Sequence, residues 1–239
     1  MVLLRSFITV FFIVFMSVQA QATWSIIIID SKTGTIGTAG ASCSPNCYGI
    51  GRIIPGKGAI IVQAMSNNEA RAKGIQMMLA NASPEEIIQA LRDPSFDPER
   101  QQYAVVTMDI INPATYTGDS THAYGGALTA PGISVQGNTL TGEQVLKDVM
   151  AAVIAGQKES LSIDLILMQA LEAGSNAGGD KRCGEQRATS AFITVYKKDD
   201  HAKKPSLNLN TFGQYKGGPN AVILLRKRYD KWKAKNSID

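Results

Sequence analysis

Thr23 is the residue with the clearest potential chemistry, because it follows a signal-peptidase pattern and begins a strand-like run. Residues 18–30 read VQAQATWSIIIID, and a cut after Ala22 would leave Thr23 with a terminal α-amine. A threonine hydroxyl needs a base to become a nucleophile. The terminal amine, with a reference pKa of about 7.7–8.0, can act as that base. The sequence therefore offers an N-terminal nucleophile that requires no histidine.

The position of the cut decides whether this chemistry is available. The small-residue rule allows a cut after Ala20, which leaves Gln21 first, or after Ala22, which leaves Thr23 first. In a second interpretation Thr23 is simply the first residue of a strand, a position where threonine is common. The residue pattern alone leaves both cuts open.

Residues 1–22 have the three parts of a secretory signal. Arg5 supplies a positive start, the apolar run FITVFFIVFM follows at residues 7–16, and small residues end the segment. The apolar run is too short to span a bilayer. We therefore expect residues 1–22 to be removed and residues 23–239 to be exported, into the periplasm or out of the cell, without a stable membrane anchor.

The three cysteines are candidates for a disulfide in an exported protein. Cys43 and Cys47 enclose the turn-like SPN of CSPNC, and Cys183 is distant in sequence. An odd count leaves one thiol over. Sequence proximity favours a Cys43–Cys47 bridge over a long-range bridge to Cys183. The histidines, His122 and His201, have no metal-ligand spacing, so no metal or other cofactor is expected.

Several common functions are disfavoured by composition and by missing motifs. The net charge of +4 is too small to indicate nucleic-acid binding. The basic segment LLRKRYDKWKAK (residues 224–235) is typical of the solvated face of a terminal helix. Neither G-x-S-x-G nor G-x-x-x-x-G-K-[ST] occurs, which argues against a serine hydrolase with a nucleophile elbow and against a P-loop nucleotidase.

The elements that must position these residues alternate between hairpins and helix pairs. Strand-like runs are predicted at 23–30, 35–42, 51–54, 58–64, 103–110, near 116, 122–124, 132–138 and 189–196. Helices are predicted from a cap at Asn68, from a capping box at Ser83–Glu86, and over 141–156, 159–174 and 220–232. This order predicts a single α+β domain, residues 23–239, with two mainly antiparallel sheets, flanking helix pairs and a basic C-terminal helix.

Four sequence blocks resemble a known family. They are residues 23–42, 51–67, 132–145 and 177–196, and their most specific parts are SVQGN and GGDKR. In order and spacing they are similar to the domain of unknown function 1028 family, which resembles a branch of the N-terminal nucleophile (Ntn) hydrolases. The resemblance implies a four-layer αββα sandwich. Cytosolic relatives typically begin Met-Thr, so the resemblance favours the cut that makes Thr23 first.

The resemblance also implies roles for four amide side chains. Gln63 and Asn67 lie in VQAMSN, and Gln136 and Asn138 lie in SVQGN. Each pair flanks a strand end, where amides can form an oxyanion hole or bind substrate. The alternative is that these amides make structural polar contacts at strand ends.

Two charged residues and one departure complete the family comparison. Asp180 and Arg182, in GGDKR, would orient the terminal amine or hold a substrate carboxylate. A structural contact at the turn is the alternative. Cys43 stands where many relatives have a basic or bulky residue, so the cleft rim departs from the family pattern.

These observations predict an exported Ntn-type hydrolase of a small amide or peptide-like substrate, with Thr23 as nucleophile. The alternative is a non-catalytic exported ligand-binding protein, for example for cell-wall fragments, that keeps the fold. The expected partner is a small-molecule or peptide-like substrate, with no nucleic acid. The sequence leaves homo-oligomerisation open.

Overall fold

The first two strands of the described chain form the centre of the larger sheet. The computed structural model describes residues 23–236. Strand β1 (Thr23–Asp30) and strand β2 (Thr35–Ser42) pair antiparallel, as predicted, with Thr23 opposite Ser42. The predicted signal peptide, residues 1–22, lies outside the described residues.

The larger sheet has six strands in the order β10-β9-β2-β1-β8-β7, and every neighbouring pair is antiparallel. Its other strands are β7 (Gly126–Ala130), β8 (Ile133–Asn138), β9 (Ser190–Tyr196) and β10 (Leu207–Thr211). Because β1 lies between β2 and β8, Thr23 is opposite both Ser42 and Asn138. Three chain segments thus meet at the start of β1.

The sequence prediction was wrong at two strands of this sheet. Residues 122–124 form no strand, because their backbone pairs with the loop after β8: Thr139 N–H donates to His122 O, and Leu140 N–H donates to Tyr124 O. The strand follows at β7. Strand β10 was not predicted, although LNLNT alternates with period two as a half-buried edge strand should.

The smaller sheet is also antiparallel, in the order β3-β4-β5-β6. Its strands are β3 (Gly51–Ile54), β4 (Gly58–Ala64), β5 (Gln101–Thr107) and β6 (Ala114–Thr117). It packs face to face on the larger sheet, and a cluster that includes Ile27, Ile61 and Val106 fills one half of the space between them. We call this volume the inter-sheet space.

Two helices cover the outer face of the smaller sheet: α1 (Asn68–Leu79) and α2 (Pro84–Leu91). The predicted capping box at Ser83 and Glu86 is confirmed. The predicted cap of the first helix is off by one residue. Asn67, not Asn68, is the N-cap, because its side-chain oxygen accepts the N–H groups of residues 69 and 70.

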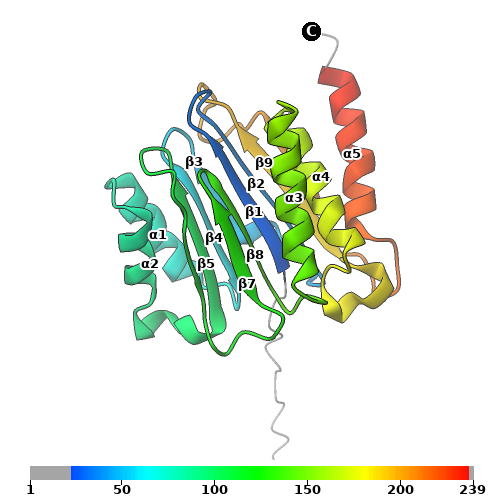
Figure 1. Cartoon of the computed structure of the whole chain (residues 1–239), viewed down its shortest axis with the longest axis horizontal. Helices are drawn as coiled ribbons and strands as arrows, with labels where there is room; N and C mark the ends of the chain where they lie inside the picture. Colours follow the sequence, from blue (N-terminus) through cyan, green and yellow to red (C-terminus); the bar gives the residue numbers. More distant parts are fainter. Residues whose placement is uncertain (1–22, 237–239) are drawn as a thin grey trace, which may run out of the picture.

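Three helices cover the outer face of the larger sheet: α3 (Gln144–Lys158), α4 (Ile163–Asn176) and α5 (Ala221–Asn236). They pack on an apolar cluster that includes Trp24, Ile26 and Ile28 of β1. The described chain thus forms helix, sheet, sheet and helix layers, an α+β arrangement consistent with a sandwich (Figure 1).

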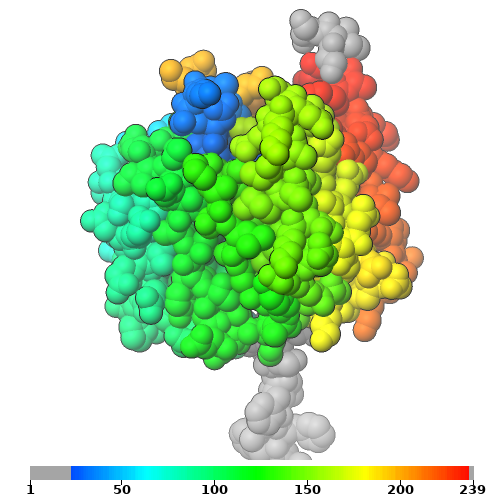
Figure 2. Space-filling view, viewed as in Figure 1, coloured from blue at the N-terminus to red at the C-terminus, as the bar shows by residue number. Residues whose placement is uncertain are grey.

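The layers bury almost all of β1. In the space-filling view only the turn after β1 reaches the surface, as blue atoms near the top (Figure 2). The exposed residues of that turn are Ser31, Lys32 and Thr33. Among residues 23–236, every helix is too short or too polar to cross a membrane.

Candidate active site at the start of β1

The alternation of side chains along β1 places Thr23 on the inner face of the larger sheet. Successive residues of a strand point to opposite faces. Trp24 and Ile26 contact the helix side, so Thr23 and Ser25 face the smaller sheet. Thr23 is fully buried. It lies at one end of the inter-sheet space, where β1, β2 and β8 meet.

A buried polar network begins two residues from Thr23. Ser25 Oγ donates to Gln63 Oε1 of β4 at 2.6 Å, and Gln136 Nε2 of β8 donates to Ser25 Oγ at 2.6 Å. Ser134 Oγ in turn donates to Gln136 Oε1 at 2.6 Å. These side chains are fully buried, so hydrogen bonds to one another replace those to water.

Gln102 of β5 is the centre of the network and was not predicted from the sequence. Its Oε1 accepts from Gln63 Nε2 at 2.7 Å and from Asn138 Nδ2 at 3.2 Å, and its Nε2 donates to Gly137 O at 2.9 Å. Gln63 Nε2 also lies 3.5 Å from the Thr23 carbonyl oxygen. The available signal was a pair of glutamines directly before the apolar run YAVV.

The four predicted amides therefore occupy different positions. Gln63 and Gln136 lie inside the network. Asn67 caps α1 and donates to Phe96 O at 3.3 Å, so its side chain is occupied by a structural contact. Asn138 is opposite Thr23 and also lines a cavity. Of the four, Asn138 has the position best suited to contact a substrate.

Asp180 and Arg182 form a buried ion pair beside this end of the sheet. Arg182 Nη2 and Nε donate to the Asp180 carboxylate at 2.8 and 3.1 Å, and Cys43 N–H donates to it at 2.7 Å. Asp180 is fully buried and bridges to Leu140, whereas the Arg182 side chain is 28% exposed. Such a two-point contact fixes the guanidinium plane. Asp180 thus fixes Arg182 beside Cys43, which follows β2, and Leu140, which follows β8.

The disulfide differs from the predicted one. Cys43 is bonded to Cys183, with a Cα–Cα distance of 5.6 Å, and Cys47 is a buried thiol. The chain turns after Cys43 and directs Cys47 into the apolar cluster with Ile50 and Phe192. Cys43 instead meets the short helix that follows Asp180. Sequence proximity was a poor guide because the two neighbouring cysteines point into different environments.

Three cavities lie around this end of the two sheets, and none has Thr23 among its lining residues. The disulfide cavity, about 490 Å³, is lined by residues that include Cys43, His122, Arg182 and Lys216. The Asn138 cavity, about 220 Å³, is lined by residues that include Ala64, Met65, Arg100, His122 and Asn138. The Arg71 cavity, about 270 Å³, is lined by residues that include Asn46, Met65, Ser66, Asn68 and Arg71. The disulfide cavity and the Asn138 cavity share His122 in their lining, and the Asn138 cavity and the Arg71 cavity share Met65.

The lining of these cavities suits hydrogen bonding and anion binding more than metal binding. Guanidinium, ammonium, amide and hydroxyl groups line them. Across residues 23–236, no group of three or more histidine, cysteine, aspartate or glutamate side chains is placed to hold a metal ion.

Comparison with known proteins identifies relatives of the same fold. Residues 23–211 match a family described as a family of unknown function, DUF1028. The chain is also similar to the crystal structure of protein SPO2555 from Silicibacter pomeroyi, described with the same family. The sequence identity is 24% and the TM-score 0.76, over 89% of this chain and 86% of that one. No curated protein matches the chain. At this identity the structural similarity concerns the fold alone.

Proposed function

This chain belongs to the DUF1028 family, and from that premise we propose that it is an exported hydrolase of the Ntn type. In this proposal Thr23, exposed by removal of residues 1–22, attacks the carbonyl carbon of a small amide or peptide-like substrate. The observation that carries the proposal is the position of Thr23. It begins an inner strand, faces the inter-sheet space and lies opposite Asn138, which lines a cavity. The family match also begins at residue 23.

The proposed reaction has two steps. The Thr23 α-amine takes the hydroxyl proton, and Oγ1 bonds to the substrate carbonyl carbon. The tetrahedral intermediate collapses with cleavage of the C–N bond, and the ammonium proton passes to the leaving amine. Water then attacks the resulting ester, gives one proton to the α-amine and releases the acid as Oγ1 recovers its proton.

Asn138 is the proposed stabiliser of the oxyanion. A side-chain amide has two N–H donors, and Asn138 gives one to Gln102. The other is available to the developing negative charge in the Asn138 cavity. Arg182, fixed by Asp180, is proposed to bind the substrate at the disulfide cavity.

A non-catalytic exported ligand-binding protein, for instance for cell-wall fragments, is the second candidate function. The observation in its favour is that three of the four predicted amides already make hydrogen bonds within the protein: Gln63, Asn67 and Gln136. A cut after Ala20 would also keep the Thr23 nitrogen in a peptide bond. The cavities would then bind a ligand without turning it over.

Sequencing the N-terminus of the exported protein, together with variants of Thr23, tests the hydrolase. We expect the mature chain to begin at Thr23. Thr23→Ala should lower turnover across a panel of small amides by at least about 10³-fold, because the nucleophile is lost. Thr23→Ser should keep part of the activity, since it keeps the hydroxyl. Unfolding midpoints of both variants check that the fold is intact.

Two results would contradict the hydrolase. One is a mature chain that begins at Gln21 and is not trimmed further. The other is a Thr23→Ala variant that turns over the same amide as fast as the wild type. Ligand binding without turnover in the wild type would support the second candidate.

A further inference from the structure

Arg71 is a buried cation without a counter-charge in the described chain. It lies on α1 and is 9% exposed. Its guanidinium donates to Ser66 Oγ at 3.2 Å and to Asn68 Oδ1, both neutral acceptors. None of the ion pairs among residues 23–236 includes it. Burial, and then the charge of Arg52, lowers the pKa of Arg71.

Such an arrangement is costly unless an anion completes it. Buried charges in proteins are normally paired. A guanidinium has five N–H donors, and the hydrogen bonds to Ser66 and Asn68 use two of them. Three donors remain, and Arg71 lines a cavity of about 270 Å³. The planar fork of these donors matches a carboxylate.

The backbone around the cavity adds to the attraction for an anion. Asn68 begins α1, a helix of 12 residues, and lines the same cavity. The N-terminal end of a helix carries partial positive charge. Arg71 and the start of α1 therefore favour the same sign of charge.

The charge of the side chains that line the three cavities agrees with this preference. Their cationic lining residues are Arg71, Arg100, Arg182 and Lys216, and no aspartate or glutamate lines any of them within the described residues. Arg100 and Arg182 are paired with Asp97 and Asp180. Arg71 is therefore the strongest anchor, because its charge is buried and has no paired carboxylate.

We propose that the Arg71 cavity binds the carboxylate of an anionic substrate whose amide lies in the Asn138 cavity beside Thr23. Met65 lines both cavities, which are therefore neighbours, and the proposed substrate extends past the Met65 side chain from one into the other. This inference rests on the proposed function and narrows its substrates to amides that also carry a carboxylate. Arg71 then determines specificity, and Thr23 performs the reaction.

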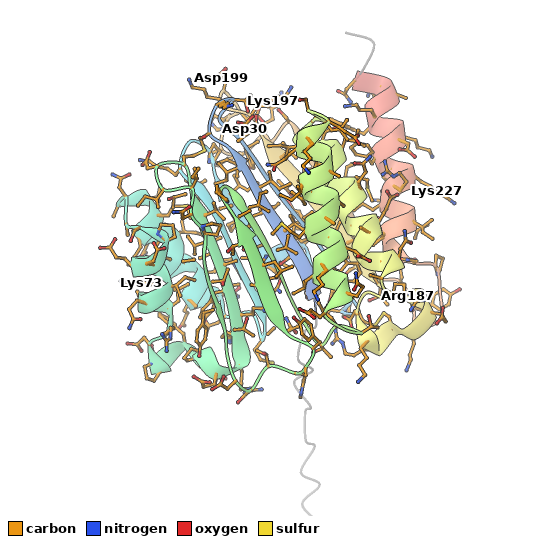
Figure 3. The ribbon with its side chains drawn as sticks, viewed as in Figure 1. Asp30, Lys73, Arg187, Lys197, Asp199 and Lys227 are labelled. Carbon is orange, nitrogen blue, oxygen red and sulfur yellow. A yellow bond between two sulfur atoms is a disulfide. The ribbon has the colours of Figure 1, made fainter. Side chains whose placement is uncertain are left out.

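A matched pair of probes and a matched pair of variants test the proposal. Glutaramate carries one amide and one carboxylate, and glutaramide replaces the carboxylate by a second amide. Binding of each is measured by titration calorimetry, with protein purified from cells that express the full chain. Arg71→Gln is compared with Lys73→Gln, which removes the same charge from the exposed side of α1, where Lys73 points away from the sheets (Figure 3).

We expect Arg71→Gln to weaken glutaramate binding about tenfold or more, because a charge-assisted two-point contact is lost. Lys73→Gln should leave it within about twofold of the wild type, since exposed charges are screened. Glutaramide should bind the wild type more weakly than glutaramate does, and neither variant should change its affinity. Arg71→Lys keeps the charge without the fork and should recover part of the affinity. Unfolding midpoints identify any variant that fails to fold.

Three outcomes would overturn the proposal. They are no glutaramate binding to the wild type at millimolar concentration, equal losses in the Arg71 and Lys73 variants, and equal affinity for the two probes. Thr23→Ala separates this inference from the proposed function. It should keep glutaramate binding, so a failure of catalysis leaves the binding result standing, and a failure of binding leaves the Thr23 test standing.

Discussion

The two halves of the inter-sheet space differ in chemistry, although the same strands form both. Along the inner face of β1, Ile29 and Ile27 give way to Ser25. On β4 and β5, the opposed pair Ile61 and Ala104 gives way to the opposed pair Gln63 and Gln102. The half near Thr23 is therefore a hydrogen-bonded amide network, and the other half is an apolar core.

The difference shows two ways of joining the same sheets. Apolar packing is non-directional and tolerates volume-conserving exchange. A buried amide network fixes each side chain by direction and becomes costly when one partner is missing. The directional half adjoins Thr23 and Asn138, where a catalytic site would need fixed positions. The buried amide network therefore gives the ends of β1, β4 and β8 one fixed arrangement beside Thr23.

The largest expected effect comes from the covalent link beside the amide half. Cys43→Ala combined with Cys183→Ala should lower the free energy of unfolding by about 4 kcal/mol, because the bond closes a loop with a sequence separation of 140. Guanidinium unfolding measures the loss, and hydrogen exchange should show the amide half opening before the apolar half. A loss below about 1 kcal/mol, or opening at the apolar half first, would show that packing alone holds that end.

A smaller effect distinguishes the two halves directly. Gln63→Met should cost about 1–3 kcal/mol, because the buried Ser25 O–H loses its acceptor and Gln102 Oε1 loses one of its two amide donors. Ile61→Val, in the apolar half, should cost about 1 kcal/mol. Urea unfolding of both variants measures the contrast.

The combined variant Ser25→Ala, Gln63→Met and Gln136→Met sharpens this prediction. Its cost should be less than the sum of the three single variants, because the partners disappear together. Additive losses would mean that these side chains do not act as one network.

The smallest effect appears only in alkaline solution. Burial, with a smaller contribution from the Asp180 carboxylate, raises the pKa of the Cys47 thiol to about 12 from its ordinary 9.0. The folded protein then keeps a proton that the unfolded chain loses. The stability from the neutral thiol is complete below pH 9.0 and is lost as the pH rises toward 12.

Relative to Cys47→Ala, the wild type should lose about 1 kcal/mol between pH values of about 9 and 10. Urea unfolding of both proteins at these values, without reductant, measures the difference. The cost of Gln63→Met should stay constant over the same range, since amides do not titrate. A parallel pH response of wild type and Cys47→Ala would mean that Cys47 is not held neutral.

The sequence predicted what local patterns determine. The hairpin of β1 and β2 follows from alternation and a turn, and the α2 capping box from Ser83 and Glu86. Gln102 illustrates what local patterns cannot reveal. Its partners come from β4, β7 and β8, and only the packing of the two sheets brings them together.

The sequence identified some residues of the candidate site but not the contacts between them, because those contacts join distant segments. The resemblance of the blocks singled out Thr23 and Asn138 separately, and the pairing of β1 with β8 places them opposite each other. Arg71 gave no sequence signal, because a basic residue on a helix is ordinarily solvated. Its significance depends on burial, a neighbouring cavity and the lack of a carboxylate partner among the described residues. The Cys43–Cys183 bond likewise depends on where separate segments meet.

That bond also changes the covalent topology of the molecule. Residues 43–183 form a closed ring, because the disulfide joins its two ends. A single break in the backbone anywhere inside the ring leaves one covalently connected molecule. The ring contains the whole smaller sheet, α1 and α2, and the Arg71 cavity. A protein nicked in a loop within residues 43–183 would therefore keep both pieces covalently linked until a reductant opens the disulfide.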